Sequence, residues 1–305
     1  MASSVRYAEL HLHLEGTLDE FTLQEIAPQL SVAEISNCYQ FTDFAGFLDS
    51  FKFAAMQLRG PDQYRLLARR CFERLAGQGI VYAEIIHSVG ICLWRGLDAR
   101  SIAEALIEEG QRAPLKVRWV FDAVRQLGEE HILETARFTS QFRGSDVLAF
   151  GVGGDERGAP VEALRPGFDL AREQGFRLVP HAGETSNAQN VWDALSLGSH
   201  RIGHGIRAIE DPALVAELCR LQIPLEISIT SNVLTGAVSS YAAHPAKLLH
   251  DAGVPLILNT DDPAFFKTTL SREFAHAQRL GFSAHDLETI RLNAFRFAFG
   301  ETPLP

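Results

Sequence analysis

The sequence predicts an α/β protein, a (β/α)8 barrel of the TIM type with a helical insertion after the first strand. Short apolar runs alternate with longer segments of helical periodicity, and strands that alternate with helices pair in parallel. Eight strand-like runs within 305 residues fit the size of such a barrel. Polar residues follow many of these runs, as expected where a barrel gathers the carboxyl ends of its strands into a working face.

Each expected element has its own local signal. Apolar or β-branched runs bounded by polar or glycine-containing stretches indicate strands. They occur at residues 7–14, 80–88, 116–124, 147–154, 176–184, 201–205, 223–229 and 254–260. Amphipathic segments that begin near Asp or Pro, or end near Gly, indicate helices. The clearest occur at residues 101–112, 129–142, 161–174, 212–221 and 244–252.

The segment 21–79 is longer than one crossover requires and is rich in helix-like sequence. We therefore expect it to form a helical insertion over the mouth of the barrel. A doubly wound sheet is the competing fold, but no G-x-G-x-x-G motif follows the first strand and the polar residues do not gather at one crevice. The sequence contains no linker, tandem repeat or low-complexity tract, so we expect residues 1–305 to form a single domain.

Composition narrows the class of function. Hydrophobic residues make up 46% and charged residues 22% of the chain, which indicates one well-buried core. The net charge of −10 argues against nucleic acid and against an anionic membrane as partners, and it favours a small neutral or weakly charged substrate. The four cysteines lack CxxC spacing and are typical of reduced core residues. No signal-like N-terminus or long apolar run is present, so we expect a cytoplasmic protein, of open oligomeric state.

Two histidines in the first expected strand point to a metal site. His11 and His13 are two residues apart, so a strand places both side chains on one face. His181, after the fifth expected strand, and Asp261, after the eighth, would complete a shell of three imidazoles and one carboxylate, with a position left for water. A lone strand-end histidine is more often a hydrogen-bonded core residue, but the combination favours a metal. Zn²⁺ suits these donors, with Fe²⁺ and Mn²⁺ as alternatives.

Six motifs then occur in a fixed order over nearly the whole chain. They are "HLHLEGTL", "HAGE", "RIGHG", "SNVLTG", "HPAKLLHDAGVPLILNTDDP" and "TLSREF". Together they resemble the adenosine deaminase family of the amidohydrolase superfamily. The resemblance implies a (β/α)8 barrel with one catalytic zinc ion, which replaces the 6-amino group of a purine with oxygen and releases ammonia.

The resemblance also implies a role for each site residue. It makes His11, His13, His181 and Asp261 the zinc ligands. Glu184 would shuttle a proton to purine N1, and His204 would orient the attacking water and stabilise the developing charge. Asp262 would contact N7 and the backbone of Gly154 would contact N3. Without the histidines, Glu184 would be interpreted as a carboxylate at a helix N-terminus and Asp262 as a cap or supporting residue.

The chemistry explains why these residue types are needed. Metal coordination lowers the pKa of water from about 16 to about 7, which supplies a nucleophile at neutral pH. Ring N1 must accept a proton as C6 becomes tetrahedral, and burial beside the ring would raise the pKa of Glu184 in the useful direction. The expected fourth strand contains no lysine to bridge two metals, so we expect one zinc ion per chain. The PCxxC signature of other zinc deaminases is also missing from the sequence.

Several polar residues are expected to support the site or to lie outside it. Ser231, Asn232 and Thr235 are expected to form a turn and to satisfy loop backbone groups around the metal ligands. His87 lies at the end of the second expected strand, and we expect it to be solvated rather than to line the pocket.

The substrate is the least determined feature. The leading hypothesis is an aminopurine nucleoside, either adenosine or a derivative with a modified 5′ end such as 6-aminodeoxyfutalosine. The alternatives are free adenine and a catalytically silent barrel that only binds a ligand. Adenosine-specific members of the family usually carry Asp where this chain has Glu15. By strand alternation Glu15 starts on the face of the two histidines, so we expect it to contact the substrate beyond N9.

Overall fold

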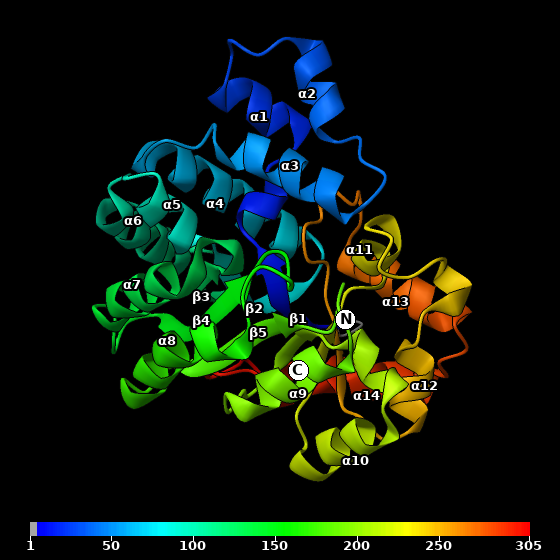
Figure 1. Cartoon of the computed structure of the whole chain (residues 1–305). Helices are drawn as coiled ribbons and strands as arrows, with labels where there is room; N and C mark the ends of the chain where they lie inside the picture. The colour runs from blue at the N-terminus through cyan, green and yellow to red at the C-terminus, as the bar shows by residue number, and fades with distance from the viewer. Residues whose placement is uncertain (1–4) are drawn as a thin grey trace.

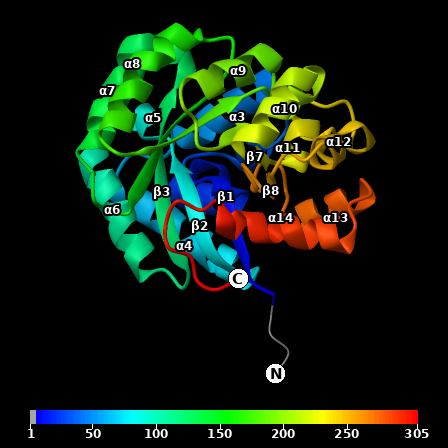
Figure 2. The same ribbon diagram turned by 90° about the horizontal axis from the view of Figure 1, so that it is seen from below.

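A computed structural model describes residues 5–305 and confirms the (β/α)8 barrel. All eight strands run parallel, in sequence order around the sheet. They are β1 Tyr7–His13, β2 Ile80–His87, β3 Lys116–Val124, β4 Val147–Gly153, β5 Arg177–Ala182, β6 Ile202–His204, β7 Leu225–Ile227 and β8 Leu256–Leu258. A parallel bridge between Leu12 and Asp261 joins β1 to the chain that leaves β8. The sheet therefore curves back on itself, as the view from below shows (Figure 2).

Helices surround this sheet (Figure 1). Those outside the insertion are α5 Val89–Trp94, α6 Ala99–Arg112, α7 Gly128–Ser140, α8 Val161–Glu173, α9 Ala188–Ser196, α10 Pro212–Leu221, α11 Ile229–Leu234, α12 Ala246–Asp251, α13 Leu270–Arg279 and α14 Ala284–Arg296. Short 3-10 helices lie at Glu15–Thr17, Arg125–Leu127, Ile206–Glu210 and Tyr241–Ala243. The five helices predicted from local sequence are confirmed, with small differences at their ends.

The predicted helical insertion is also confirmed. It contains α1 Glu20–Ile26, α2 Val32–Cys38, α3 Phe44–Ala55 and α4 Pro61–Gly77. Asp19, Ser31 and Asp43 accept hydrogen bonds from backbone N–H groups of the first turn of α1, α2 and α3, which explains where these helices begin. Phe47 of α3 packs on Phe265 and Phe266, which follow β8. The insertion is thereby held against the carboxyl ends of the strands.

Two features differ from the prediction. The last three strands are shorter than expected. At the end of β6, His204 and Gly205 have φ values of 60° and 65°, which no strand continues through. The sequence also does not single out α5, a helix of six residues that follows β2 and packs against β3. Among residues 5–305, no helix combines the length and the apolar character needed to span a bilayer.

Candidate active site

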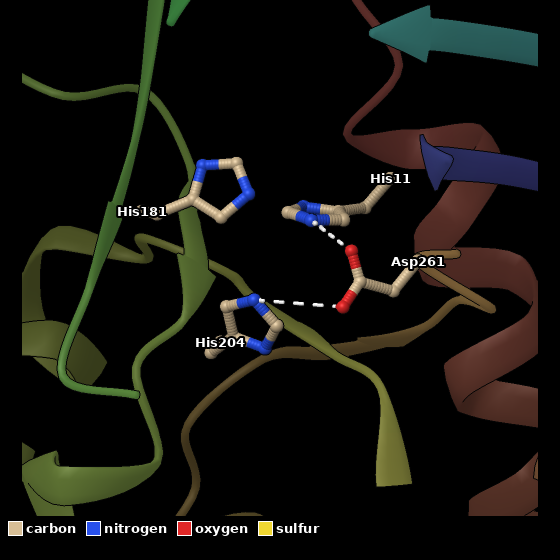
Figure 3. Close-up of side chains that lie close together, drawn as sticks. All are labelled: His11, His181, His204 and Asp261. Atoms are coloured by element: carbon tan, nitrogen blue, oxygen red, sulfur yellow. Dashed lines mark ion pairs between the residues drawn. The ribbon is translucent and has the colours of Figure 1, made fainter. Parts of the chain in front are cut away.

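Five predicted side chains converge where the strands end. His11 and His13 come from β1, His181 from β5 and His204 from β6, and Asp261 follows β8. Each of His11, His181, His204 and Asp261 offers a donor atom within 4.8 Å of the others (Figure 3). His13 Nε2 lies 3.1 Å from His181 Nε2 and 3.4 Å from Asp261 Oδ1. Parallel strands bring these side chains together because their carboxyl ends meet at one face.

The donor atoms fit a metal ion. His11 Nδ1 donates to Glu226 Oε2 at 2.7 Å, and His181 Nδ1 donates to the carbonyl oxygen of Val152 at 3.0 Å. Each imidazole therefore presents Nε2 as a lone pair toward the cluster, the arrangement that outer carboxylates and carbonyls give to metal-binding histidines. His11 Nε2 is buried and has no hydrogen-bond partner among the described residues. Three imidazoles and a carboxylate suit Zn²⁺.

Backbone hydrogen bonds join β1 to Asp261, which follows β8, and so close the barrel. Asp261 has a φ of 65°, which is uncommon for a residue with a side chain. Its N–H donates to the carbonyl of His11 at 3.1 Å, and its carbonyl accepts from the N–H of His13 at 2.9 Å. Gly203 lies beside the same cluster, where a Cβ atom would come within 2.9 Å of His11 Cε1. The glycine of "RIGHG" therefore makes room for a candidate ligand.

Glu184 lies at the edge of this cluster. Its side chain is buried, and burial together with the charges of Asp261 and Glu156 raises its pKa well above the usual value. Glu156 accepts hydrogen bonds from the backbone N–H groups of Gly183, Glu184 and Thr185, at 2.6, 2.7 and 2.8 Å. Glu156 thus fixes the backbone that carries Glu184. The raised pKa favours the protonated carboxylic acid at this position.

Asp262 and Gly154 lie on other sides of the same space. Burial, followed by the charge of Asp261, raises the pKa of Asp262, and Asp262 Oδ1 has no partner among the described residues. A Cβ atom on Gly16 would lie 2.0 Å from this oxygen, so the glycine of "LEGT" allows the carboxyl group to take its place. Gly154 follows β4 with a φ of 97°, a conformation that favours glycine. Because glycine has no side chain, none covers the backbone here.

These residues border a cavity of about 430 Å³, which falls within the usual range for ligand sites. The predicted residues on its wall are His13, Gly154, His181, Glu184, His204, Asp261 and Asp262. Beyond them the cavity continues to an apolar region under the insertion. That region is lined by Phe44, Phe47, Leu48 and Phe51 of α3 and by Ile91 and Trp94 of α5.

Glu15 and His87 form a buried pair. Glu15 Oε1 accepts a hydrogen bond from His87 Nδ1 at 2.8 Å, and its other oxygen lies 3.4 Å from the N–H of Ser88. The described residues that line the cavity do not include Glu15. The expectation that His87 is solvated is wrong, because its side chain is fully buried. Its partner lies 72 positions away in the chain, so no local pattern indicates the pair.

Residues of "SNVLTG" support the site, although they form helix α11 rather than the expected turn. Ser231 Oγ donates to Asp261 Oδ2 at 2.6 Å, and Thr235 Oγ1 donates to the carbonyl of Ser231 at 2.8 Å. Asn232 Nδ2 lies 3.0 Å from His204 Nδ1. The first two residues of the motif therefore contact the side chains proposed to carry the chemistry.

Sequence reasoning missed a charged network inside the barrel. Arg201 is fully buried, and it donates to Glu226 Oε1 and to Glu84 Oε2, both at 2.5 Å. Glu226 in turn holds His11. Asp122 of β3 was also missed, a buried carboxyl group on the cavity wall whose Oδ1 has no partner among the described residues. The available signal was an acidic residue within an otherwise apolar strand, as in "IPLEISI" and "WVFDAV".

Comparison with known proteins decides the family. The family model described as adenosine deaminase matches residues 7–303. The chain belongs to the adenosine deaminase family. An aminodeoxyfutalosine deaminase of Streptomyces avermitilis is 38% identical over 287 residues, which cover 90% of this chain and 80% of the relative. An adenine deaminase of Sinorhizobium fredii is 35% identical over 313 residues, which cover 99% of this chain and 97% of the relative.

The solved structures agree with this family. The crystal structure of an adenine deaminase from Arthrobacter aurescens has a TM-score of 0.90 and 29% identity, covering 98% of this chain and 95% of that chain. As a member of the adenosine deaminase family, the protein is a hydrolytic deaminase. The family is metal-dependent, and the buried cluster of histidines and Asp261 fits a metal site. The resemblance inferred from the six motifs is confirmed.

Proposed function

We propose that this protein is a zinc-dependent deaminase, acting as one domain over residues 1–305, which replaces the 6-amino group of a purine nucleoside with oxygen and releases ammonia. One zinc ion would be held by His11, His13, His181 and Asp261. The observation that carries the proposal is the position of Glu184, a buried acid of raised pKa at the edge of a cluster of metal-binding donors. A nucleophile and a proton donor are the two things that the reaction requires.

Each side chain has a task in this reaction. Bound zinc supplies the nucleophile by lowering the pKa of water to about 7. Glu184 donates a proton to N1 as C6 becomes tetrahedral. The electron pair displaced from the C6–N1 double bond is then held on N1 as an N–H bond. His204 stabilises the charge that develops beside C6, where its Nε2 lies 3.7 Å from Glu184 Oε2. Asp262 and the backbone of Gly154 orient the base through N7 and N3.

The cavity favours a substrate larger than a free base. It extends beyond the metal-binding side chains to α3 and α5, which leaves space for a group attached at N9. We propose adenosine or a derivative with a modified 5′ end, such as 6-aminodeoxyfutalosine. The similarity to an aminodeoxyfutalosine deaminase over 90% of this chain supports the modified nucleoside.

Adenine is the second candidate. It is supported by the similarity to an adenine deaminase over 99% of this chain. A barrel that binds purines without turnover is disfavoured, because the acid and every metal-binding side chain are present.

A substrate screen tests these proposals. Zinc-loaded protein is incubated with adenosine, deoxyadenosine, adenine, methylthioadenosine and 6-aminodeoxyfutalosine, and deamination is followed by ultraviolet absorbance. We expect the highest kcat/KM with a nucleoside. A higher kcat/KM with adenine would replace the nucleoside proposal, and no turnover of any of the five would refute aminopurine deamination.

A further inference from the structure

A chain of hydrogen bonds runs behind His204, away from the cavity. His204 Nδ1 lies 3.0 Å from Asn232 Nδ2, and Asn232 Oδ1 lies 3.2 Å from Nε2 of His244. His244 Nδ1 accepts a hydrogen bond from the backbone N–H of Ala246, at 3.2 Å. All three side chains are buried, with exposed fractions of 1%, 0% and 4% for His204, Asn232 and His244. The chain joins His204 of "RIGHG", Asn232 of "SNVLTG" and His244, which begins "HPAKLL". Of these three residues, the proposed reaction uses only His204.

The backbone N–H at the end of this chain fixes the direction of every bond. Ala246 begins helix α12, and its N–H can only donate. His244 Nδ1 must therefore accept, which requires a neutral imidazole with its proton on Nε2. Burial favours this state, because it lowers the pKa of His244 to about 4. His244 Nε2–H then donates to Asn232 Oδ1, and this sets which way the amide of Asn232 is turned.

The oriented amide then determines the proton position on His204. Asn232 Nδ2 can only donate, so His204 Nδ1 must be a lone pair and His204 Nε2 must carry the proton. That N–H faces the cavity between two carboxyl groups, 3.7 Å from Glu184 Oε2 and 3.9 Å from Asp261 Oδ2. Both distances exceed a direct hydrogen bond, so the N–H is free for a small group between them.

Two other histidines of the cluster show the opposite pattern. His11 and His181 each donate from Nδ1, to Glu226 and to the carbonyl of Val152, and so present Nε2 lone pairs. His204 lies equally close to the cluster, but its partner is a donor rather than an acceptor. Distance alone does not separate these three histidines, whereas their hydrogen-bond partners do.

We propose that Asn232 and His244 are positioning residues that hold His204 as the Nε2–H tautomer, so that His204 donates a hydrogen bond into the active site and does not bind the metal. The proposal rests on the proposed function for its catalytic consequence. It assigns roles to two buried side chains that do not line the cavity. Reversing either residue from donor to acceptor is expected to reverse the tautomer of His204.

The first test exchanges Asn232 for its acceptor-only isostere. In Asn232→Asp, the side chain accepts from both histidines, so His204 carries its proton on Nδ1 and presents a lone pair to the cavity. Zinc-loaded protein labelled with ¹⁵N at histidine is expected to show the two nitrogen resonances of His204 exchanged, and kcat is expected to fall about 10²- to 10⁴-fold. Thr235→Val, directly after the same helix but outside the chain of bonds, is the matched control and is expected to keep the wild-type spectrum.

The second test uses a matched pair at His244 and does not require Asn232→Asp to fold. His244→Gln can still donate to Asn232 Oδ1 and is expected to keep the His204 spectrum, with kcat within about tenfold of wild type. His244→Glu can only accept, which turns the amide of Asn232 around, and is expected to reproduce the Asn232→Asp spectrum. An unchanged spectrum in both Asn232→Asp and His244→Glu would overturn the proposal. Because the spectrum is independent of turnover, it also separates failure of this proposal from failure of the proposed function.

Discussion

Replacing Glu226 by glutamine tests how the interior of the barrel supports the metal site. The carboxylate accepts from His11 Nδ1 at 2.7 Å and from Arg201 Nε at 2.5 Å. Burial raises the pKa of Glu226. The charge of Arg201 and the hydrogen bond from His11 lower the pKa by more, so the net pKa lies below its usual value. Glu226→Gln removes this charge, and the glutamine amide can accept through one atom only. Either His11 or Arg201 therefore loses its acceptor.

The expected magnitude follows from these contacts. Loss of a hydrogen-bond partner behind a metal ligand typically weakens metal binding about 10- to 100-fold, which is about 1.4–2.7 kcal/mol. Breaking a buried ion pair costs about 3–5 kcal/mol of folding stability, and the low end applies because Arg201 keeps its bond to Glu84.

Zinc affinity is measured by competition with a chelator, and stability by urea unfolding. Glu109→Gln is the matched control, since Glu109 is also buried and held by Arg69 at 2.7 and 2.8 Å, but on the outer face of the barrel. The control is expected to lose stability and to keep its zinc affinity. If Glu226→Gln also kept the wild-type affinity, the view that Glu226 orients His11 for metal binding would be wrong.

Three further predictions concern single carboxylates. Glu184→Gln is expected to keep its zinc and to lose about three orders of magnitude in kcat, because an amide cannot transfer the proton; near-normal turnover would assign the proton transfer to another residue. Glu15→Asp, which shortens the partner of His87, is expected to change the ranking of adenosine, adenine and 5′-modified nucleosides by kcat/KM at constant zinc content, and an unchanged ranking would exclude Glu15 from substrate selection. Burial raises the pKa of Glu273, so the native state binds the proton of this carboxyl group more tightly than the unfolded state does. Folding stability therefore falls as pH rises from about 4.3 through the raised pKa. Glu273→Gln is expected to reduce this slope in urea unfolding at pH 4 and pH 8, and an unchanged slope would contradict it.

Much of the fold could be predicted because strand and helix periods are local signals. The alternation in "ELHLHL" placed His11 and His13 on one face, and the structure has both at the cluster. The turns at His204, the last residue of β6, and at Asp261, after β8, could not be predicted, because a positive φ is uncommon for residues with a side chain and no sequence pattern indicates it. Both side chains contact helix α11, Asp261 through Ser231 and His204 through Asn232.

The supporting residues were harder to predict than the reacting ones. A strand-end histidine is usually expected in solvent, but the burial of His87 depends on Glu15, in the 3-10 helix that follows β1. Arg201 was not singled out, because a buried arginine requires two acids that come from β2 and β7. A sequence shows which residue types are present, but the pairing of buried charges is decided only by the packing of the barrel.

Ammonia release with and without metal tests the central claim most directly. Protein stripped by a chelator, and the same protein reloaded with one equivalent of zinc, are given the best 6-aminopurine of the substrate screen, and ammonia is measured against substrate consumed. We predict one ammonia per purine in the reloaded protein and less than about one hundredth of that rate in the stripped protein. Full activity after complete removal of the metal, or purine consumption without ammonia, would contradict metal-dependent hydrolytic deamination.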